Sequence, residues 1–568
     1  MSAERARPAR WTVTRRVERE LVDQLLRNRG IVDRERFFAP DYLRDSHDPF
    51  LLPNMSTAVD RILAAIAAKE LLAVYTDYDA DGVPGGALLM KMLTALGAPI
   101  VPYVPDRERE GYGLHVPAIN ALKAKGVSLI ITVDLGVTND EQVAHAHSLG
   151  IDVIVTDHHH VDPTRIPTAA IAVVHPALPE SAYPFAGLAG GGVAWKLVQA
   201  LQARTGTPSE AQLKWWLELP AISTVCDIVP LVDENRMIVH YGLKVLMQTR
   251  NVGLRALYRT AGIDVDVLNE GTIGFQIGPR INAPGRMEHA TGALKLLLSD
   301  QADEAAALAA QIEEQNRDRQ TALEQIVAEV VARVEEDGLA DAPAIVLLGD
   351  DWPVGLIGLA ASRVVERFYR PTILLGRSGD EAKGSGRSID GFDLLAGIDA
   401  QKALLTGYGG HTKAAGLHLP VANVEAFAAG FRAFAVERLS ADQLVRTLRA
   451  DAIISPAEVT DELVTTVLRF APFGQANPRP KFIIQPLTVA AIKTVGTGGR
   501  HLKVRFVEGD LDAIGFGIGS LATHIRVGDA VAAFASLEFN SWNGVVRTQL
   551  KLEDLRPCGT GDIATELA

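Results

Sequence analysis

The 568-residue sequence has only two cysteines, Cys226 and Cys558, and it lacks any run approaching the length of a membrane span, about 20 apolar residues. Two cysteines exclude a disulfide scaffold and a cysteine zinc cluster, and they fit a reducing compartment. The basic segment Met1–Arg16 lacks the apolar stretch of a signal peptide and is typical of a frayed tail. We therefore expect a soluble, cytoplasmic protein that does not associate with membranes.

Excess positive charge is also lacking. The chain has 56 Lys and Arg against 69 Asp and Glu, a net charge of −13. This balance argues against a protein that coats nucleic acid with positive charge. It does not exclude a nucleic-acid enzyme, because a cation site built from carboxylates has the same sign. Gly-x-Ser-x-Gly and Gly-Lys-Ser/Thr strings are absent, so neither a serine nucleophile elbow nor a P-loop is indicated.

From about residue 57 the hydrophobic pattern alternates between the helical and the strand period. Apolar strands separated by helical stretches indicate a parallel sheet covered by helices on both faces. The predicted strands are Leu71–Thr76, Pro99–Val104, Val127–Val133, Ile151–Thr156 and Ala170–Val174. The predicted helices are Val59–Ala68, Pro84–Leu96, Val116–Lys125 and Glu141–Leu149.

The later part of the chain changes character twice. Gln301–Asp337 has no Gly or Pro and predicts one long helix joining two domains. A second, smaller α/β block follows, with strand Ala344–Leu348, helix Leu356–Phe368 and strand Thr372–Leu375. After about Ser455, short strands separated by Gly turns predict a small β-barrel or sandwich.

Three carboxylates follow the first strand of the parallel sheet. Strand Leu71–Thr76 leads directly into Asp77, Asp79 and Asp81. The carboxyl ends of parallel strands face the ligand crevice, and carboxylates this close repel one another unless a cation or hydrogen bonds compensate them. A polar turn that caps the next helix, or a calcium loop, would also fit. A calcium loop usually continues with a Glu, which Gly85–Leu89 lacks.

Other apolar segments end in the same way. Val127–Val133 leads into Asp134, Ile151–Thr156 into Asp157-His158-His159-His160, and Ile222–Cys226, interpreted as another strand end, into Asp227. Any one of these side chains could cap a helix, but several on one rim favour a cation site. Oxygen ligands with one or two imidazoles suit Mn²⁺ or Mg²⁺. The surplus of carboxylates indicates two ions, as in two-metal phosphoryl hydrolysis.

At these residues the chain resembles the DHH phosphoesterase superfamily and, within it, the RecJ family of bacterial single-strand exonucleases. The resemblance extends from about residue 35 to 557. It rests on an ordered set of motifs: Tyr75–Gly82, Val133–Gly136, Thr156–His159, Leu188–Ala194, Val225–Leu231, Gly278–Arg286, Gly384–Ser388, Gly409–His411 and Pro472–Pro478.

The resemblance implies a role for individual residues. Asp134 is expected to bridge two Mn²⁺ or Mg²⁺ ions, His159 to lie near the scissile phosphate, and Asp157 to orient an imidazole. Asp81, which could cap the helix, and His160 receive no role. The implied metal ligands are Asp77, Asp79, Asp134, His158 and Asp227. The implied substrate contacts are Arg280, in a Gly/Pro-rich loop, Arg387, and Gly409, Gly410 and His411, placed between helices.

The sequence departs from the RecJ pattern at Pro353, His175 and Pro284, and we expect these departures to affect DNA contacts rather than the metal ligands. The barrel region Phe473–Pro557 contains 10 Lys or Arg and 7 Asp or Glu, a net charge of +3. Lys503 and Arg505 alternate with apolar residues and should share a strand face. An OB-like barrel that follows a single strand by charge fits this pattern.

The resemblance implies six regions. They are an N-terminal extension (1–48), a DHH domain (49–300), a connecting long helix (301–338), a DHH-associated substrate-binding domain (339–454), an OB-like nucleic-acid-binding domain (455–557) and a tail (558–568).

The implied activity is 5′-to-3′ hydrolysis of single-stranded DNA to 5′-mononucleotides in DNA repair and recombination. It would be carried out by a monomer that cooperates with a single-stranded-DNA-binding protein and a RecQ-type helicase. A hydrolase of small phosphates, such as nanoRNA, cyclic dinucleotides or pyrophosphate, would not need the barrel and the long helix. A replication scaffold without activity would tolerate loss of ligands, but every expected ligand type is present.

Overall fold

The computed structural model describes the chain except for residues 1–8, 108, 288–289, 543–544, 560–562 and 567–568. The chain forms two compact units. One consists of Ala39–Thr321 and Pro472–Pro478; the other consists of Met1–Phe38, Ala322–Ala471 and Arg479–Ala568. The division falls inside α16 (Ala302–Glu336), the single helix that the sequence predicted there. The predicted α/β fold with a terminal barrel is confirmed.

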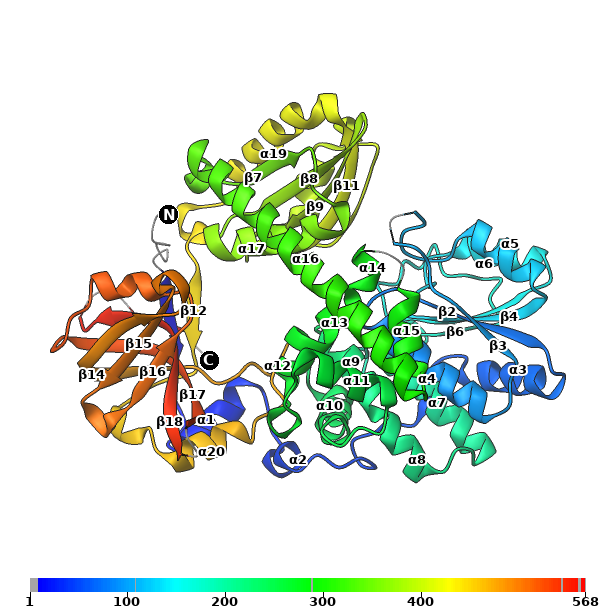
Figure 1. Ribbon diagram of the computed structural model, residues 1–568, viewed down its shortest axis with the longest axis horizontal. Helices are drawn as coiled ribbons and strands as arrows, with labels where there is room; N and C mark the ends of the chain where they lie inside the picture. The colour runs from blue at the N-terminus through cyan, green and yellow to red at the C-terminus, as the bar shows by residue number, and fades with distance from the viewer. Residues whose placement is uncertain (1–8, 108, 288–289, 543–544, 560–562, 567–568) are drawn as a thin grey trace. The chain divides into compact units, whose positions relative to one another are not determined.

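The first unit is built on a five-stranded sheet whose strands are all parallel (Figure 1). Thr76 lies beside Val133, and Thr156 beside Val174, so neighbouring strands finish at the same edge of the sheet. The strand order is β3 (Ile100–Tyr103), β2 (Leu71–Thr76), β4 (Val127–Val133), β5 (Asp152–Thr156) and β6 (Ala172–Val174).

Helices bury both faces of this sheet. Along β2, Leu72 and Val74 join the core on one face, whereas Ala73 and Tyr75 join the core on the other. This is the period of two expected of a strand, with both faces apolar because both are covered. The first core includes α3 (Met55–Ala67), α4 (Gly82–Ala95) and α7 (Gly190–Thr205); the second includes α5 (Val116–Ala124) and α6 (Asp140–Ser148).

The segment before Asp227 is a helix and not the predicted strand. Ile222–Cys226 belongs to α9 (Glu218–Cys226), which packs against α4, α7 and α10. A short apolar run fits a buried helix as well as a buried strand, and periodicity alone does not separate them. The remaining described helices of this unit are η1 (Pro49–Leu51), α8 (Glu210–Lys214), η2 (Trp215–Leu217), α10 (Asp233–Leu246), α11 (Val252–Ala261), η3 (Val265–Val267), α12 (Glu270–Thr272), η4 (Ile273–Ile277), α13 (Gly278–Asn282), α14 (Pro284–Met287) and α15 (Thr291–Leu298).

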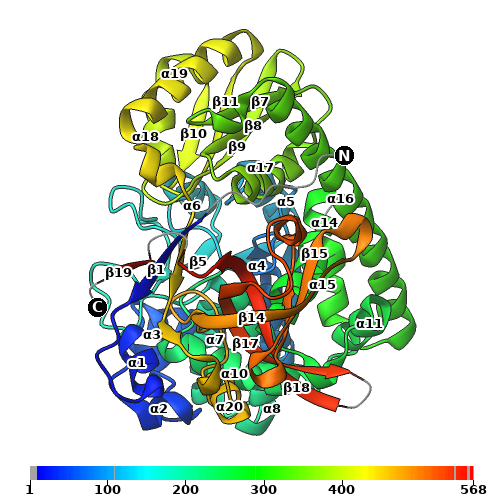
Figure 2. The ribbon, with the colours of Figure 1, turned by 90° about the vertical axis from the view of Figure 1, so that its left-hand side faces the viewer.

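The second unit contains a mixed five-stranded sheet with helices on both faces (Figure 2). Ile345 and Leu347 pack with α17 (Val354–Phe368) and the last turns of α16. Val346 faces the opposite core, with α18 (Leu394–Asp399) and α19 (Val424–Arg438). The strand order is β10 (Gly407–Gly410), β11 (Ala414–Pro420), β9 (Glu381–Arg387), β8 (Thr372–Ser378) and β7 (Ile345–Gly349).

The predicted barrel is formed by the last strands of the chain. Its sheet closes because β14 pairs with β17 as well as with its other neighbours. Lys503 and Arg505 are both exposed on β15, as the alternation predicted. The order is β13 (Ala452–Ile454), β14 (Phe482–Val495), β15 (His501–Phe506), β16 (Asp512–Gly515), β18 (Val545–Pro557) and β17 (Ala530–Trp542), with α20 (Asp461–Leu468) preceding β14.

The prediction that Met1–Arg16 forms a frayed tail is wrong for the residues of the first strand. β1 (Arg10–Thr14) pairs in parallel with β12 (Thr447–Ala450) and β19 (Ile563–Glu566). The side chain of Trp11 is buried, and its Nε1 donates to Asp554 at 2.9 Å. Burial of this indole and the backbone pairing order the strand despite the basic residues around it. The chain continues through α1 (Leu21–Asn28) and α2 (Arg34–Phe38).

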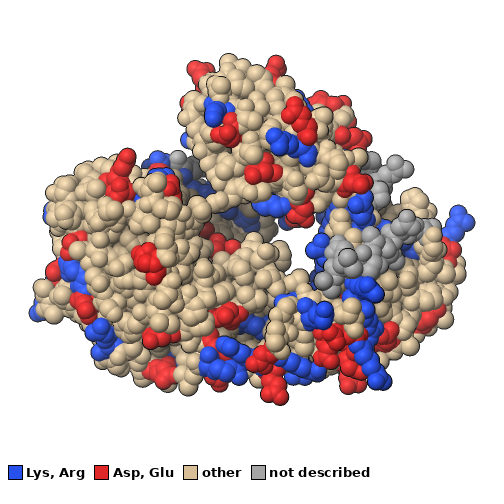
Figure 3. Space-filling view, turned by 180° about the vertical axis from the view of Figure 1, so that it is seen from behind, with Lys and Arg blue, Asp and Glu red and all other residues tan. Residues whose placement is uncertain are grey.

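Charged side chains of both signs are interspersed on the face drawn in Figure 3.

Among the described residues, no helix combines the length and the hydropathy that crossing a membrane requires.

Candidate metal centre

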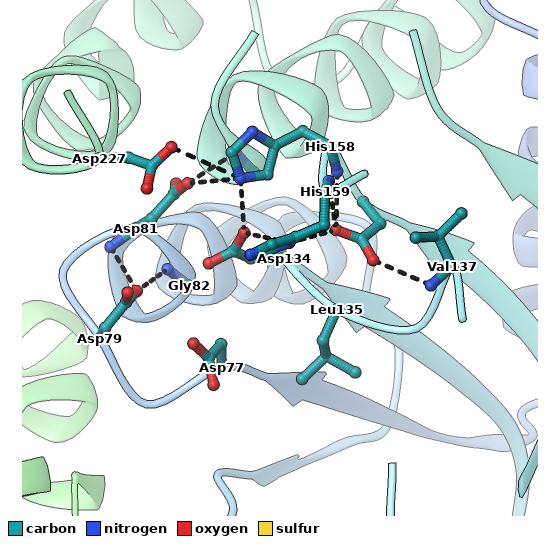
Figure 4. A network of polar contacts seen from close by, with 12 residues as sticks. Asp77, Asp79, Asp81, Gly82, Asp134, Leu135, Val137, His158, His159 and Asp227 are labelled. Carbon is teal, nitrogen blue, oxygen red and sulfur yellow. Dashed lines mark hydrogen bonds and ion pairs between the residues drawn. The ribbon is translucent and has the colours of Figure 1, made fainter. Parts of the chain in front are cut away.

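Carboxylates and imidazoles from four parts of the first unit meet at one edge of its sheet (Figure 4). The Nε2 atom of His158 lies 3.2 Å from Oδ1 of Asp134 and 3.5 Å from one carboxylate oxygen each of Asp81 and Asp227. The donor atoms form three groups, each within 4.8 Å: Asp77, Asp79 and Asp134; Asp134, His158 and His159; and Asp81, His158 and Asp227. Asp134 belongs to two of them.

Three donor atoms of the cluster are buried and make no hydrogen bond with the described residues. Asp77 Oδ1, Asp134 Oδ1 and His158 Nε2 are enclosed but make no hydrogen bond with the part of the chain that the structure describes. Burial, with the neighbouring carboxylates, raises the pKa of Asp77 and Asp134 well above the usual range and that of Asp227 to about 8. Uncompensated oxygen donors with an imidazole fit a divalent cation such as Mn²⁺ or Mg²⁺.

The backbone is shaped to bring Asp134 into this cluster. Asp134 has φ +66°, a left-handed conformation that costs energy for a residue with a side chain, and Gly136 follows with φ +117°. The N-terminus of α7 approaches so closely that a Cβ at Gly190 would overlap the Asp134 carboxylate. Glycine at 190 is therefore required by the position of Asp134.

Asp81, which the sequence analysis left without a role, lies within the cluster, with one carboxylate oxygen 3.5 Å from His158 Nε2. The sequence analysis allowed Asp81 to cap α4, but its side chain makes no capping hydrogen bond there. Its carboxylate instead accepts the backbone N–H groups of Gly190 at 2.8 Å and Gly191 at 2.7 Å, where α7 begins. One oxygen of Asp79 takes the capping position on α4, accepting the N–H groups of Asp81 and Gly82. The spacing of the three carboxylates was the available sign that Asp81 belongs to the site. Its partner helix α7 could not be identified from the sequence, because it lies about 110 residues away along the chain.

His159 is held by Asp157 beside the cluster. Its Nδ1 lies 2.8 Å from Asp157 Oδ1 and 3.7 Å from Asp134 Oδ1. Burial opposes the imidazolium, but the hydrogen bond to Asp157 and the charge of that carboxylate outweigh it and raise the pKa of His159 to about 9. At Asp157 burial alone would raise the pKa, but the hydrogen bond to His159, the charge of that imidazole and the backbone N–H of Val137 together hold the pKa well below the usual range. The contact with Asp157 therefore favours the charged form of His159.

Two further side chains hold His159 in place. They are Tyr112, which the sequence analysis did not identify, and His175, for which it predicted a different role. The Tyr112 hydroxyl lies 3.0 Å from His159 Nδ1 and donates to the Asp134 carbonyl at 3.3 Å. His175, predicted to influence DNA contact, is fully buried, and its Nε2 lies 2.8 Å from the His159 carbonyl. Its Nδ1 accepts the N–H of Ala177, so Nε2 is the donor. His175 thus supports the loop from inside the protein.

Arg280 lies in helix α13 and not in a loop. Its guanidinium forms an ion pair with Glu313 at 2.6 Å, and both side chains are largely buried. Two residues further along, Asn282 Oδ1 accepts the N–H of Ala80 at 2.9 Å. The Gly278–Arg286 motif therefore contacts the loop that carries Asp77 and Asp79 through Asn282, which the sequence analysis did not single out.

The other expected substrate contacts belong to the second unit. Gly409 and Gly410 were predicted to lie between helices. They lie instead in strand β10, which pairs with β11. Arg387 is at the end of β9, and β11 pairs with it through Ala414 and with Gly410 through Ala415. Arg387 and Gly410 thus lie near the same end of one three-stranded segment. The guanidinium of Arg387 donates to the Ser385 hydroxyl at 3.0 Å.

Comparison with known proteins agrees with this organisation. Residues 72–223 match the DHH family N-terminal domain, 341–437 the DHHA1 domain, and 450–554 the RecJ OB domain. A RecJ single-stranded-DNA-specific exonuclease from Bacillus subtilis is 38% identical over 94% of this chain and 67% of its own length. The Escherichia coli RecJ exonuclease is 33% identical over 89% of this chain and 91% of its own length.

Solved structures show the same likeness. The crystal structure of RecJ in complex with Mn²⁺ from Thermus thermophilus has a TM-score of 0.84 at 29% identity, covering 98% of this chain and 81% of that one. The corresponding Mg²⁺ complex has a TM-score of 0.75 at 28% identity, covering 98% and 80%. The fold and the cluster thus define a protein of the DHH class. Within that class, the chain belongs to the RecJ family of single-stranded-DNA-specific exonucleases.

Proposed function

We propose that this chain is a metal-dependent exonuclease that hydrolyses single-stranded DNA in the 5′-to-3′ direction and releases 5′-mononucleotides. The observation that carries the proposal is the set of buried, uncompensated donors around Asp134, which belongs to two donor groups. A carboxylate shared in this way suits a bridge between two cations. The relatives named as single-stranded-DNA-specific exonucleases support the substrate. A role in DNA repair and recombination is proposed from the resemblance to the family.

Each residue of the cluster receives a role. Bound Mn²⁺ or Mg²⁺ ions would supply Lewis acidity and a water activated at neutral pH. The residues proposed to hold them are Asp77, Asp79, Asp134, His158 and Asp227.

Asp81 is proposed to position α7 against Asp134 rather than to bind an ion, because both of its oxygens accept backbone N–H groups. His159, kept charged by Asp157, is placed to stabilise negative charge on a phosphate or to donate a proton.

The second unit is proposed to hold the DNA. Backbone N–H groups near paired glycines can approach a phosphate closely, so Gly409, Gly410 and His411 are the proposed phosphate contacts, with Arg387 beside them. Arg280 would have to leave Glu313 to reach a phosphate. On the barrel, Arg505 is already paired with Asp510, which leaves Lys503 as the stronger candidate on that strand face.

Several expectations stay predictions. They are the limits of the six regions, cytoplasmic location, action as a monomer, and cooperation with a single-stranded-DNA-binding protein and a RecQ-type helicase.

The deciding experiment is hydrolysis of a single-stranded oligonucleotide labelled at its 5′ or its 3′ end, with Mn²⁺, Mg²⁺ or EDTA. We expect 5′-labelled mononucleotide as the first labelled product with either metal, no product in EDTA, and a resistant blunt duplex. The Asp134→Asn variant should be inactive, whereas Asp152→Asn, at the start of β5 and paired with Arg61, should retain activity. An oligonucleotide that stays intact with both metals would refute the proposal.

A further inference from the structure

A cavity in the first unit lies at one end of two helices whose other ends reach the metal centre. Its volume is about 450 Å³, within the range of ligand sites. Lys91 lines it from the third turn of α4, roughly 14 Å along the helix from Gly82 at 1.5 Å per residue. Glu218 lines it from the first residue of α9, whose last residue, Cys226, precedes Asp227. The cavity is therefore distinct from the metal centre.

Two cations line this cavity, and neither forms an ion pair with the described residues. Lys91 is mostly buried, which lowers its pKa although the charges of Glu218 and Asp300 oppose this, and it makes no hydrogen bond with the described residues. The Arg250 guanidinium lies 3.7 Å from the Trp215 ring centroid, and no acidic partner for it occurs in the described part of the chain. A guanidinium stacked on an indole keeps its N–H edge available to an oxyanion. Lys91 and Arg250 can therefore both bind an anionic ligand that enters the cavity.

The acidic side chain in the cavity is Glu218, and burial weakens its charge. Its Oε2 accepts the Thr249 hydroxyl at 2.5 Å. Burial raises the pKa of Glu218 to about 7, although the Thr249 hydrogen bond and the charge of Lys91 oppose this. Near neutral pH the carboxyl is about half protonated, and even when ionised it faces two cations, Lys91 and Arg250, so the lining of the cavity has a net positive charge within a chain whose net charge is −13.

The cavity also has aromatic walls. Trp215 and the half-buried Trp216 both line it. Indole rings and stacked guanidinium planes are surfaces on which nucleobases stack. A ligand that uses all of these features carries a doubly charged oxyanion and a flat ring.

We propose that this cavity binds a nucleoside 5′-monophosphate, with the phosphate held by Lys91 and Arg250 and the base against Trp216. The inference goes beyond the proposed exonuclease and does not require it, because the cavity alone carries the argument. The ligand is of the class that the proposed reaction releases.

The test is equilibrium binding of thymidine 5′-monophosphate to the full chain by calorimetry in EDTA, which removes any contribution of metal ions at the acidic cluster. Thymidine and inorganic phosphate are the matched ligands. We expect saturable binding of the nucleotide, at least about tenfold tighter than either fragment, because each supplies only part of the contacts. Arg250→Gln and Lys91→Met should each weaken it about tenfold or more, since each removes a charge-assisted contact.

Two controls separate the outcomes. Arg259→Gln removes an exposed cation of α11 that does not line the cavity, and Asp134→Asn alters the metal centre; neither should change binding. Absence of binding at millimolar nucleotide, or equal affinity in the wild type and in Arg250→Gln or Lys91→Met variants with unchanged thermal unfolding, would overturn the proposal. Phosphate binding as tightly as the nucleotide would overturn the assignment of the base. Because the assay contains no metal, inactivity of the nuclease does not affect its result.

Discussion

Two of the places where the first unit buries charge, the Lys196–Glu234 pair and the cluster around Asp134, differ in the balance of that charge. Lys196 and Glu234 have side chains with no solvent exposure, and their charged atoms are 2.7 Å apart. Lys196 also donates to the His47 carbonyl at 2.6 Å, and the Tyr183 hydroxyl donates to Glu234. In the cluster around Asp134, the residues Asp77, Asp81 and Asp134 are also buried, but several carboxylates there face one another and some donor atoms make no hydrogen bond with the described residues.

The difference shows what separates a structural charge from a functional one. Burial of an ionisable group is common to both places and so identifies neither. The balance of charge separates them: the Lys196–Glu234 pair is complete within the chain, whereas in the Asp134 cluster the carboxylates outnumber the histidines, and a metal cation would restore the balance. Three changes would break or sharpen this contrast.

The largest effect is expected from breaking the balanced pair. Lys196→Met leaves Glu234 buried without a cation, and we expect it to lower the free energy of unfolding by about 3–5 kcal/mol. Urea unfolding followed by circular dichroism measures the loss. The double variant Lys196→Met with Glu234→Leu should lose less than the single variant, because no charge is stranded. A single variant as stable as the double would show that the pair is not balanced as described.

The next effect is stabilisation of the unbalanced cluster by metal. At free Mn²⁺ of about 100 times the dissociation constant, we expect a gain of about 2.7 kcal/mol in the free energy of unfolding relative to EDTA. Thermal and urea unfolding with and without Mn²⁺ measure it. The gain should disappear in Asp134→Asn and persist in Asp152→Asn. Equal stability of the wild type in EDTA and Mn²⁺ would contradict a cation-dependent cluster.

The smallest effect concerns the charge on His159. Asp157→Asn removes the carboxylate that raises the pKa of His159 to about 9, so this pKa should fall toward its usual value near 6.5. The imidazolium is present below its pKa and is lost as pH rises through it. We expect a rate about 10–100-fold lower near pH 8 and an alkaline limb of the pH–rate profile that moves to lower pH. Single-turnover hydrolysis across pH measures both, and an unmoved alkaline limb would rule out this role of His159.

The sequence by itself was sufficient for the sheet and for the donor types. β2 and β4 begin and end where the periodicity predicted, because alternation of apolar residues over a buried strand is a local property. Asp77, Asp134 and His158 come just after the ends of the predicted strands. Because parallel strands bring their carboxyl ends to one edge of the sheet, the sequence placed these side chains together.

Only the tertiary structure decided which partner each polar group has. Asp227 reaches the cluster from a helix, Asp81 caps α7 instead of α4, and Arg280 pairs with Glu313. The last two contacts join residues 109 and 33 positions apart. Periodicity describes only neighbours along the chain, so it carries no information on such pairs. They are set by the packing of α7, α9 and α13 around the sheet.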